Sequence, residues 1–496
     1  MFSQRFPLLF RAASRLTTTK RTYPVFDAVV LAYVSVTLLV QVLFQISPVV
    51  TFFSATPLIE LQTWLGLAGG ALLTIDFFTS KRMWQGPYCL FLVGILFFAA
   101  LASVRTIDYG VKYNLFKLCW AAIQFLLFYS CAYRADREQL KKYAKGLFFV
   151  LLVIWLIACC VSLYQFARLI RYDYVVNPMA QDASTNRQGF YDNRLFGIFY
   201  TLNHAAYGSL MFFLLGLVYA FRTKRMTLKV FLILSNVILL CHIVASQSRS
   251  AMVALCVCMF SMAFLAVRSK LYLSSPRRLT LSAVCAVLAL ALTIVVLSAV
   301  KMGLTYVPTL TAEVFDLPAV EYGPHLFDRQ MDDGNVSNGR LSIWKDYLSL
   351  TGEFGPIGIS PGNYMAYIYE NHQDLYIVDF IRTHWPDRYA SGVIYHMHSG
   401  YLMVLVSAGW IGAALMLMFA LSCVSRLFGK LKDGHKTSNT ILLLFLLVAA
   451  VAISAVFDEG IFFQNNPHTS IFWLALGFLM RECTPAKDTD LSKPVM

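Results

Sequence analysis

Long apolar stretches alternate with short polar connections along most of the chain. A helix that crosses a membrane needs about 20 mostly apolar residues, and the pattern predicts twelve such spans. Because Asn465, Asn466 and His468 interrupt the last of them, it has the weakest pattern. We therefore expect an all-α polytopic membrane protein. The predicted spans are 26–46, 57–77, 87–104, 113–132, 146–167, 203–221, 228–246, 250–267, 279–300, 399–424, 439–457 and 461–480.

Two of the polar connections, 168–202 and 301–398, are much longer than the others. We divide the chain accordingly into a membrane region with spans 1–9 (residues 1–300, including the loop 168–202), an outer domain (301–398), and a membrane region with spans 10–12 and a tail (399–496). The outer domain is rich in aromatic residues, so we expect it to be folded.

The outer domain has local signals for helices. Apolar residues recur at helical spacing in SNGRLSIWKDYLSL (337–350), where Ser337 or Asn338 is a suitable N-cap. The Gly- and Pro-rich stretch that follows predicts a turn, and residues 364–376 fit a second short helix. The loop between spans 9 and 10 is therefore predicted to be mainly helical.

Composition supports a membrane protein and excludes a disulfide framework. The chain is 58% hydrophobic and 14% charged, whereas soluble domains are about 45–50% apolar and about 25% charged. Of the eleven cysteines, all but Cys483 lie in apolar runs and none lies in 301–398. We interpret them as buried free thiols, since neither a disulfide pattern nor zinc spacing is present.

The net charge of +14 follows membrane topology and does not predict nucleic-acid binding. Of the 41 Lys and Arg residues, 27 lie in one alternating set of connections that includes both termini. By the positive-inside rule this set is cytoplasmic. The basic N-terminus resembles a signal or transit segment, but no cleavage site follows, so we interpret it as an anchor for a retained first span. The segment 301–398 carries 12 acidic and 6 basic residues and is predicted to lie on the outer face of the membrane.

Two arginines lie at the predicted outer boundary. Arg194 precedes the sixth span, and Arg249 lies in the very short connection between the seventh and eighth spans. An arginine near hydrocarbon costs about 2.5–3.5 kcal/mol and usually has a partner. Both could converge on an anion such as a lipid pyrophosphate, which guanidinium groups bind in a bidentate way. Pairing with Asp458 or Glu459, or snorkelling to lipid phosphates, is the alternative.

Two histidines end the outer domain, in the sequence YHMHSGY that leads into the tenth span. A neutral imidazole accepts a proton near pH 7, so one of these two histidines is a candidate general base. A polar residue at the membrane interface is the alternative for His396 and His398 alike. The first outer connection, 47–56, has no carboxylate to hold a metal.

No metal or cofactor is predicted from the remaining motifs. Asp332 and Asp333 could bind a cation, but a solvated turn fits them better because calcium sites usually supply more oxygen ligands. No nucleotide-binding loop or nucleophile elbow is present. We therefore expect chemistry that needs neither a cofactor nor a nucleotide.

Four segments, in order between residues 194 and 413, resemble the O-antigen ligase and Wzy-type polymerase family. HSGYLMVLVSAGWIGA is similar to its His-containing motif with a Gly-x-x-Gly close, and SQSRSAMVAL to its Ser-Arg-Ser/Gly segment. RLFGIFYTLNHAA is similar to its Arg…Gly…Asn stretch, and NGRLSIWKDYLSLTGEFGPIGISPGNY to its Arg…Trp helix and following turn.

The resemblance implies a GT-C-like membrane glycosyltransferase that is inverting and metal-independent. Its donor is a glycan on undecaprenyl pyrophosphate and its acceptor is a sugar hydroxyl of lipid A–core, at a periplasmic site in the bacterial inner membrane. By motif matching, His398 is the base, and Arg194 and Arg249 hold the pyrophosphate. Further substrate contacts are Arg340, His396, Asn203 and Trp344.

Other functions remain open at this point. An O-antigen polymerase uses the same donor but a second lipid-linked glycan as acceptor, and a protein O-oligosaccharyltransferase uses a protein. A secondary transporter or lipid flippase is an alternative of a different class, since intramembrane charges often mark transport paths. The few charges in the spans and the lack of an obvious inverted repeat argue against transport.

Overall fold

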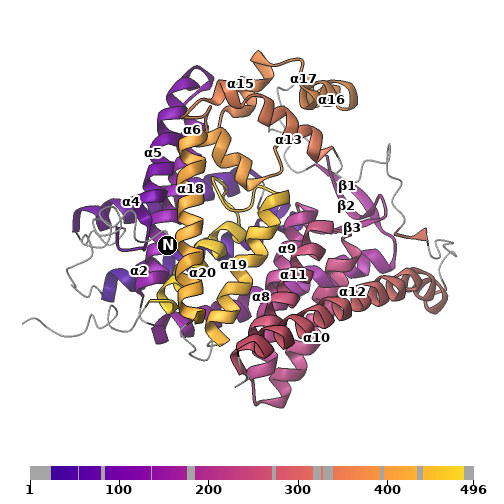
Figure 1. Cartoon of the computed structure of the whole chain (residues 1–496). Coiled ribbons are helices and arrows are strands. Elements are labelled where there is room, and N and C mark those ends of the chain that lie inside the picture. Colours follow the sequence, from indigo (N-terminus) through magenta and orange to yellow (C-terminus); the bar gives the residue numbers. More distant parts are fainter. Residues whose placement is uncertain are drawn as a thin grey trace, which may run out of the picture.

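The computed structural model describes residues 24–53, 55–79, 84–135, 137–175, 185–270, 275–316, 325–327, 339–390, 396–432 and 439–484. Long helices form a bundle, and the short helices of the outer domain lie together at one end of it (Figure 1). The predicted basic N-terminal anchor before residue 24, the Ser337 or Asn338 cap, and Asp332 and Asp333 lie outside the described residues.

The predicted polytopic α-fold is confirmed. Within the described ranges, ten helices are long and apolar enough to cross a membrane. The helices for the two other predicted spans are shorter, α5 with 17 residues and α20 with 16. The helices are α2 (Pro24–Leu43), α3 (Ser47–Phe52), α4 (Ala55–Thr79), α5 (Cys89–Arg105), η3 (Ile107–Tyr109), α6 (Lys112–Ala122), η4 (Ile123–Phe128), α7 (Tyr129–Arg134), α8 (Arg137–Ala167), α9 (Leu202–Arg222), α10 (Met226–Ala245), α11 (Arg249–Lys270), α12 (Ser275–Val314), α13 (Arg340–Ser349), α14 (Thr351–Phe354), α15 (Tyr364–Asn371), α16 (Tyr376–His384), α17 (Pro386–Ala390), α18 (Gly400–Lys432), α19 (Asn439–Phe457) and α20 (Pro467–Glu482).

Two predicted spans differ from the sequence pattern in a way that matters for the site. The twelfth span was predicted from residue 461, but α20 begins only at Pro467, with the Asn466 side chain accepting a hydrogen bond from the Thr469 amide. Residues 458–466 therefore form an irregular segment, in which the side-chain directions are not set by a helical repeat. In the fourth span, residues 123–128 form a π-helical stretch, a feature found often at functional sites.

A small antiparallel sheet, which the hydrophobic pattern did not predict, occupies the loop before the sixth span. It has the order β1 (Arg171–Val175), β2 (Thr185–Tyr191) and β3 (Arg194–Gly197). Asp192 and Asn193 form the two-residue turn between β2 and β3, and their φ angles of 47° and 57° are those of a type I′ hairpin. This turn places Arg194 at the start of β3.

A break in α18 receives the Gly- and Pro-rich turn of the outer domain. Gly409 interrupts the helix with φ 65° and ψ −166°, a conformation that favours glycine. Pro356 O then accepts from Ile411 N at 3.2 Å, and Ile359 N donates to Val406 O at 2.7 Å. The inserted turn thus satisfies backbone groups that the break leaves without helical partners.

Connections that were predicted to lie outside meet at one end of the bundle, which we call the site end. Ile46 and Phe199 form a β-bridge, and Arg105 donates to Gly358 O at 3.0 Å. Asn114 Oδ1 accepts from the amide of Gly362 at 2.8 Å. The outer domain is therefore attached to the helix ends at the same end where the candidate histidines and arginines lie.

Candidate active site

The loop with the two histidines is held from both sides. Trp344 of α13 donates its indole N–H to Met397 O at 3.0 Å, between the two histidines. On the other side, the amide of Gly400 donates to Asp458 O at 2.9 Å. His398 has a φ of 49°, which is uncommon for a residue with a side chain and is often found at functional sites. The loop is thus fixed in a conformation that its own sequence does not favour.

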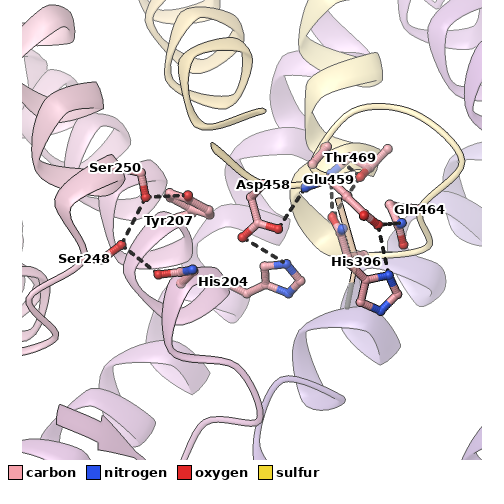
Figure 2. A network of polar contacts seen from close by, with 12 residues as sticks. His204, Tyr207, Ser248, Ser250, His396, Asp458, Glu459, Gln464 and Thr469 are labelled. Carbon is pink, nitrogen blue, oxygen red and sulfur yellow. Dashed lines mark hydrogen bonds and ion pairs between the residues drawn. The ribbon is translucent and has the colours of Figure 1, made fainter. Parts of the chain in front are cut away.

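Two adjacent buried carboxylates follow α19 and face different histidines. Asp458 Oδ2 lies 3.9 Å from His204 Nε2, while Glu459 Oε2 lies 3.4 Å from His396 Nδ1. Figure 2 shows the two side chains pointing apart. From the sequence, Asp458 and Glu459 were considered only as partners for arginines; the structure places both beside imidazoles.

The electrostatic environment of His398 suits a proton acceptor. Burial lowers the pKa of its imidazole, Asp458 opposes this shift, and the Arg340 guanidinium adds to it. The pKa of Asp458 is held below its ordinary value because the imidazoles of His204 and His398 outweigh the effect of burial, which acts in the opposite direction. His398 is therefore a neutral base at pH 7 with an ionised carboxylate near it.

The two predicted pyrophosphate ligands lie at one corner of the site end. Arg194 Nε donates to Ser246 O at 3.4 Å, at the C-terminus of α10. Arg249 is the first residue of α11, only a short turn further along the chain. The N-terminus of a helix such as α11 attracts anions, because its amides and dipole are directed outward. We call Arg194, Arg249 and this helix end the arginine corner.

A chain of hydroxyl groups ties α9 to the arginine corner. Ser248 Oγ donates to Asn203 Oδ1 at 3.2 Å and lies 3.4 Å from Ser250 Oγ, which is 2.7 Å from the Tyr207 hydroxyl (Figure 2). Asn203 was expected to contact substrate. The structure gives its oxygen a structural partner, and its predicted contact with substrate stays a prediction.

A small pocket lies between α9, α19 and α20, next to Asp458. Among its lining residues are His204, Tyr207, Asp458 and His468. His468 is buried, and neither of its ring nitrogens has a hydrogen-bond partner among the described residues. From the sequence we had noted it only as an interruption of a span, because no pattern signals that it lies beside Asp458.

The structure therefore brings the predicted residues together in two groups. The group at the histidine loop consists of His396 and His398 in the loop and of Arg340 and Trp344 beside it. The group at the arginine corner consists of Arg194, Asn203 and Arg249. Their catalytic and binding roles stay predictions.

Comparison with known families gives a match to part of the chain. Residues 234–417 match the family described as O-Antigen ligase, and this match supports the resemblance to the O-antigen ligase/Wzy superfamily. No curated protein and no solved structure matches significantly. The matched segment includes Arg249 and His398, whereas Arg194, Asp458 and Glu459 lie outside it.

Proposed function

We propose that this multi-pass membrane protein, whose segment 234–417 matches the O-antigen ligase family, is an O-antigen ligase. It transfers a glycan from undecaprenyl pyrophosphate to a sugar hydroxyl of lipid A–core, with inversion and without a metal ion. The observation that carries the proposal is the position of His398, a base with a lowered pKa beside Asp458, at the end of the bundle that also holds the arginine corner.

The two groups of residues fit the two halves of such a reaction. The acceptor hydroxyl is a poor nucleophile, so His398 takes its proton as the oxygen bonds to the anomeric carbon. Asp458 stabilises the imidazolium that forms. The bond from the anomeric carbon to the phosphate oxygen breaks, and Arg194, Arg249 and the end of α11 stabilise the pyrophosphate that leaves.

The charge distribution supports an active site that faces away from the cytoplasm, which in an O-antigen ligase is the periplasmic side of the inner membrane. The site end contains the connections that carry few basic residues for their length, and the positive-inside rule assigns such connections to the outside. Both termini are then cytoplasmic. This orientation places the site where lipid-linked glycans and lipid A–core meet.

Reconstitution tests the proposal. The purified full-length protein in lipid nanodiscs is mixed with undecaprenyl-pyrophosphate-linked glycan and lipid A–core, and products are separated on a gel. A ligase attaches glycan to lipid A–core, whereas a polymerase lengthens the lipid-linked glycan and leaves lipid A–core unchanged. Covalent transfer to neither acceptor, together with movement of intact donor across liposome membranes, would instead support a flippase.

A further inference from the structure

Glu459 is a buried carboxylate whose role the proposed reaction leaves open. Its side chain is only 7% exposed, and Oε2 lies 3.4 Å from His396 Nδ1. Its other oxygen, Oε1, is buried and has no hydrogen-bond partner among the described residues. Burying a carboxylate is costly unless it is paired. A half-satisfied charge in this position therefore indicates a function that goes beyond packing.

A line of hydrogen bonds fixes the Glu459 oxygen that faces His396. Gln464 Nε2 donates to Glu459 Oε2 at 2.6 Å, and Gln464 Oε1 accepts from the buried Lys117 ammonium at 3.1 Å. Gln124, in the π-helical stretch, donates to Gln464 O at 2.7 Å. The carboxylate is thus anchored through the irregular segment 458–466 to the fourth span.

The side chain of His396 is much more exposed than that of Glu459. Its side chain is 53% exposed, although Nδ1 faces Glu459 and lies 3.3 Å from the buried Tyr364 hydroxyl. When one ring nitrogen is engaged in this way, the tautomer and the direction of the other are determined. Nε2 is then oriented for a hydrogen bond to a ligand at the mouth of the site.

The side of the site on which His396 lies is also informative. In Figure 2, Ser248 and Ser250, which flank Arg249 in the sequence, lie on one side of Asp458, and His396, Glu459 and Gln464 lie on the other. In an inverting displacement, the nucleophile approaches the anomeric carbon from the side opposite the leaving group. If the pyrophosphate binds at the arginine corner, the acceptor therefore has to bind on the side of His396.

We infer that His396 and Glu459 form an acceptor subsite, in which His396 hydrogen-bonds a hydroxyl of the acceptor saccharide and Glu459 is the positioning residue that orients it. This inference rests on the proposed function. It assigns different tasks to the two neighbouring histidines. His398 takes the proton of the acceptor hydroxyl, and His396 binds the acceptor saccharide.

Steady-state kinetics of the reconstituted full-length protein test the inference. Initial rates are measured against the concentration of each substrate for the wild type, His396→Ala, Glu459→Gln and the double variant. We expect each single change to raise the KM for acceptor about three- to tenfold, as for one lost hydrogen bond. The KM for donor should stay within about twofold. The double variant should resemble His396→Ala, because Glu459 acts through His396.

A second His–Glu pair in the outer domain provides the matched control. Glu353 Oε2 lies 2.9 Å from His372 Nε2, and Glu353→Gln removes the same charge away from the histidine loop. It should leave both KM values unchanged. If Glu459→Gln fails to fold, the exposed His396→Ala still decides the question, and His396→Gln should restore part of the acceptor affinity by keeping a polar group at the end of the side chain.

The outcomes separate this inference from the proposed function. If the wild type transfers glycan but His396→Ala leaves the KM for acceptor unchanged, or raises the KM for donor instead, the acceptor subsite is wrong and the ligase remains. If the wild type transfers glycan to no acceptor, the proposed function fails, and the acceptor subsite fails with it.

Discussion

The regions around His242 and His398 differ in what surrounds the imidazole. His242 of α10 is fully buried, with Nδ1 2.9 Å from Ser209 Oγ, and the indole of Trp155 donates to the same hydroxyl at 2.9 Å. His398 instead lies in a loop with a positive φ, within electrostatic reach of Asp458 and Arg340. His242 therefore joins three helices, whereas His398 can exchange a proton near an ionised carboxylate.

We propose that an imidazole in this protein becomes chemically useful through its neighbours and not through burial alone. Around His242 the neighbours are a neutral hydroxyl, an indole and the ring of Phe199, whose centroid lies 5.1 Å away. Around His398 they are groups that carry charge. Each prediction below tests whether this separation of a structural from a catalytic histidine is correct.

The largest effect is expected for His398→Ala. Loss of a general base typically lowers the rate by about 10²–10⁴-fold. Since the arginine corner is untouched, binding of donor should persist. Transfer and donor binding are measured on the same nanodisc preparation. Near wild-type transfer by the variant would show that His398 is not the general base. The proposed difference between His242 and His398 would then be wrong.

Arg249→Ala is expected to have the next largest effect. A donor lost from the place where charge develops costs about 10²-fold or more. Arg249→Lys should retain more activity than Ala, because lysine keeps the charge but loses the bidentate geometry. Initial rates at several donor concentrations measure this. Full activity of Arg249→Ala in correctly inserted protein would mean that the residue only anchors the helix at the interface.

The pH profile should show a smaller, graded effect. Protonation of His398 abolishes its action as a base, so the rate falls as pH drops through its pKa. Because burial lowers that pKa, we expect the acid limb below the ordinary value of about 6.5. Asp458 raises the pKa of His398, so Asp458→Asn should move the limb to still lower pH and also slow transfer. An acid limb that shifts upward in Asp458→Asn would contradict the arrangement.

The sequence predicted the helices of both regions well, but it predicted only part of the site. Apolar runs of span length identify α9, α10 and α19 directly, and family motifs pick out Arg249 and His398. The carboxylates were not recognised as partners of the histidines. They follow α19 in a segment whose apolar residues continued into the predicted twelfth span, and periodicity does not show that residues 458–466 leave the helix.

Other parts of the site depend on tertiary contacts that leave no local trace. The indole of Trp344 donates a hydrogen bond to Met397 O, a contact that no local pattern shows, and its expected contact with substrate stays a prediction. Lys117 and Gln464 come from distant parts of the chain and meet only because α6 and the 458–466 segment pack together. The sheet of 171–197 was also missed, since its strands are short and carry many polar residues.

His242→Ala should affect stability and not catalysis. The change removes the hydrogen bond to Ser209 from a fully buried site, which costs about 1–3 kcal/mol. Thermal unfolding in detergent should show a lower Tm, while the transfer rate per folded molecule stays close to that of the wild type. If His242→Ala instead lowers the rate as much as His398→Ala without a loss of stability, the distinction between the two regions is wrong.

No change in transfer is expected on treatment with EDTA. In the proposed mechanism, Arg194, Arg249 and the end of α11 supply the positive charge that stabilises the leaving pyrophosphate, so that no divalent cation is needed. The rate is measured before and after chelation, with Arg249→Lys as a sensitised background in which a contributing cation would be easier to detect. Loss of transfer with EDTA, restored by magnesium or manganese, would show that the arginine corner is not sufficient and that the donor is bound as a metal complex.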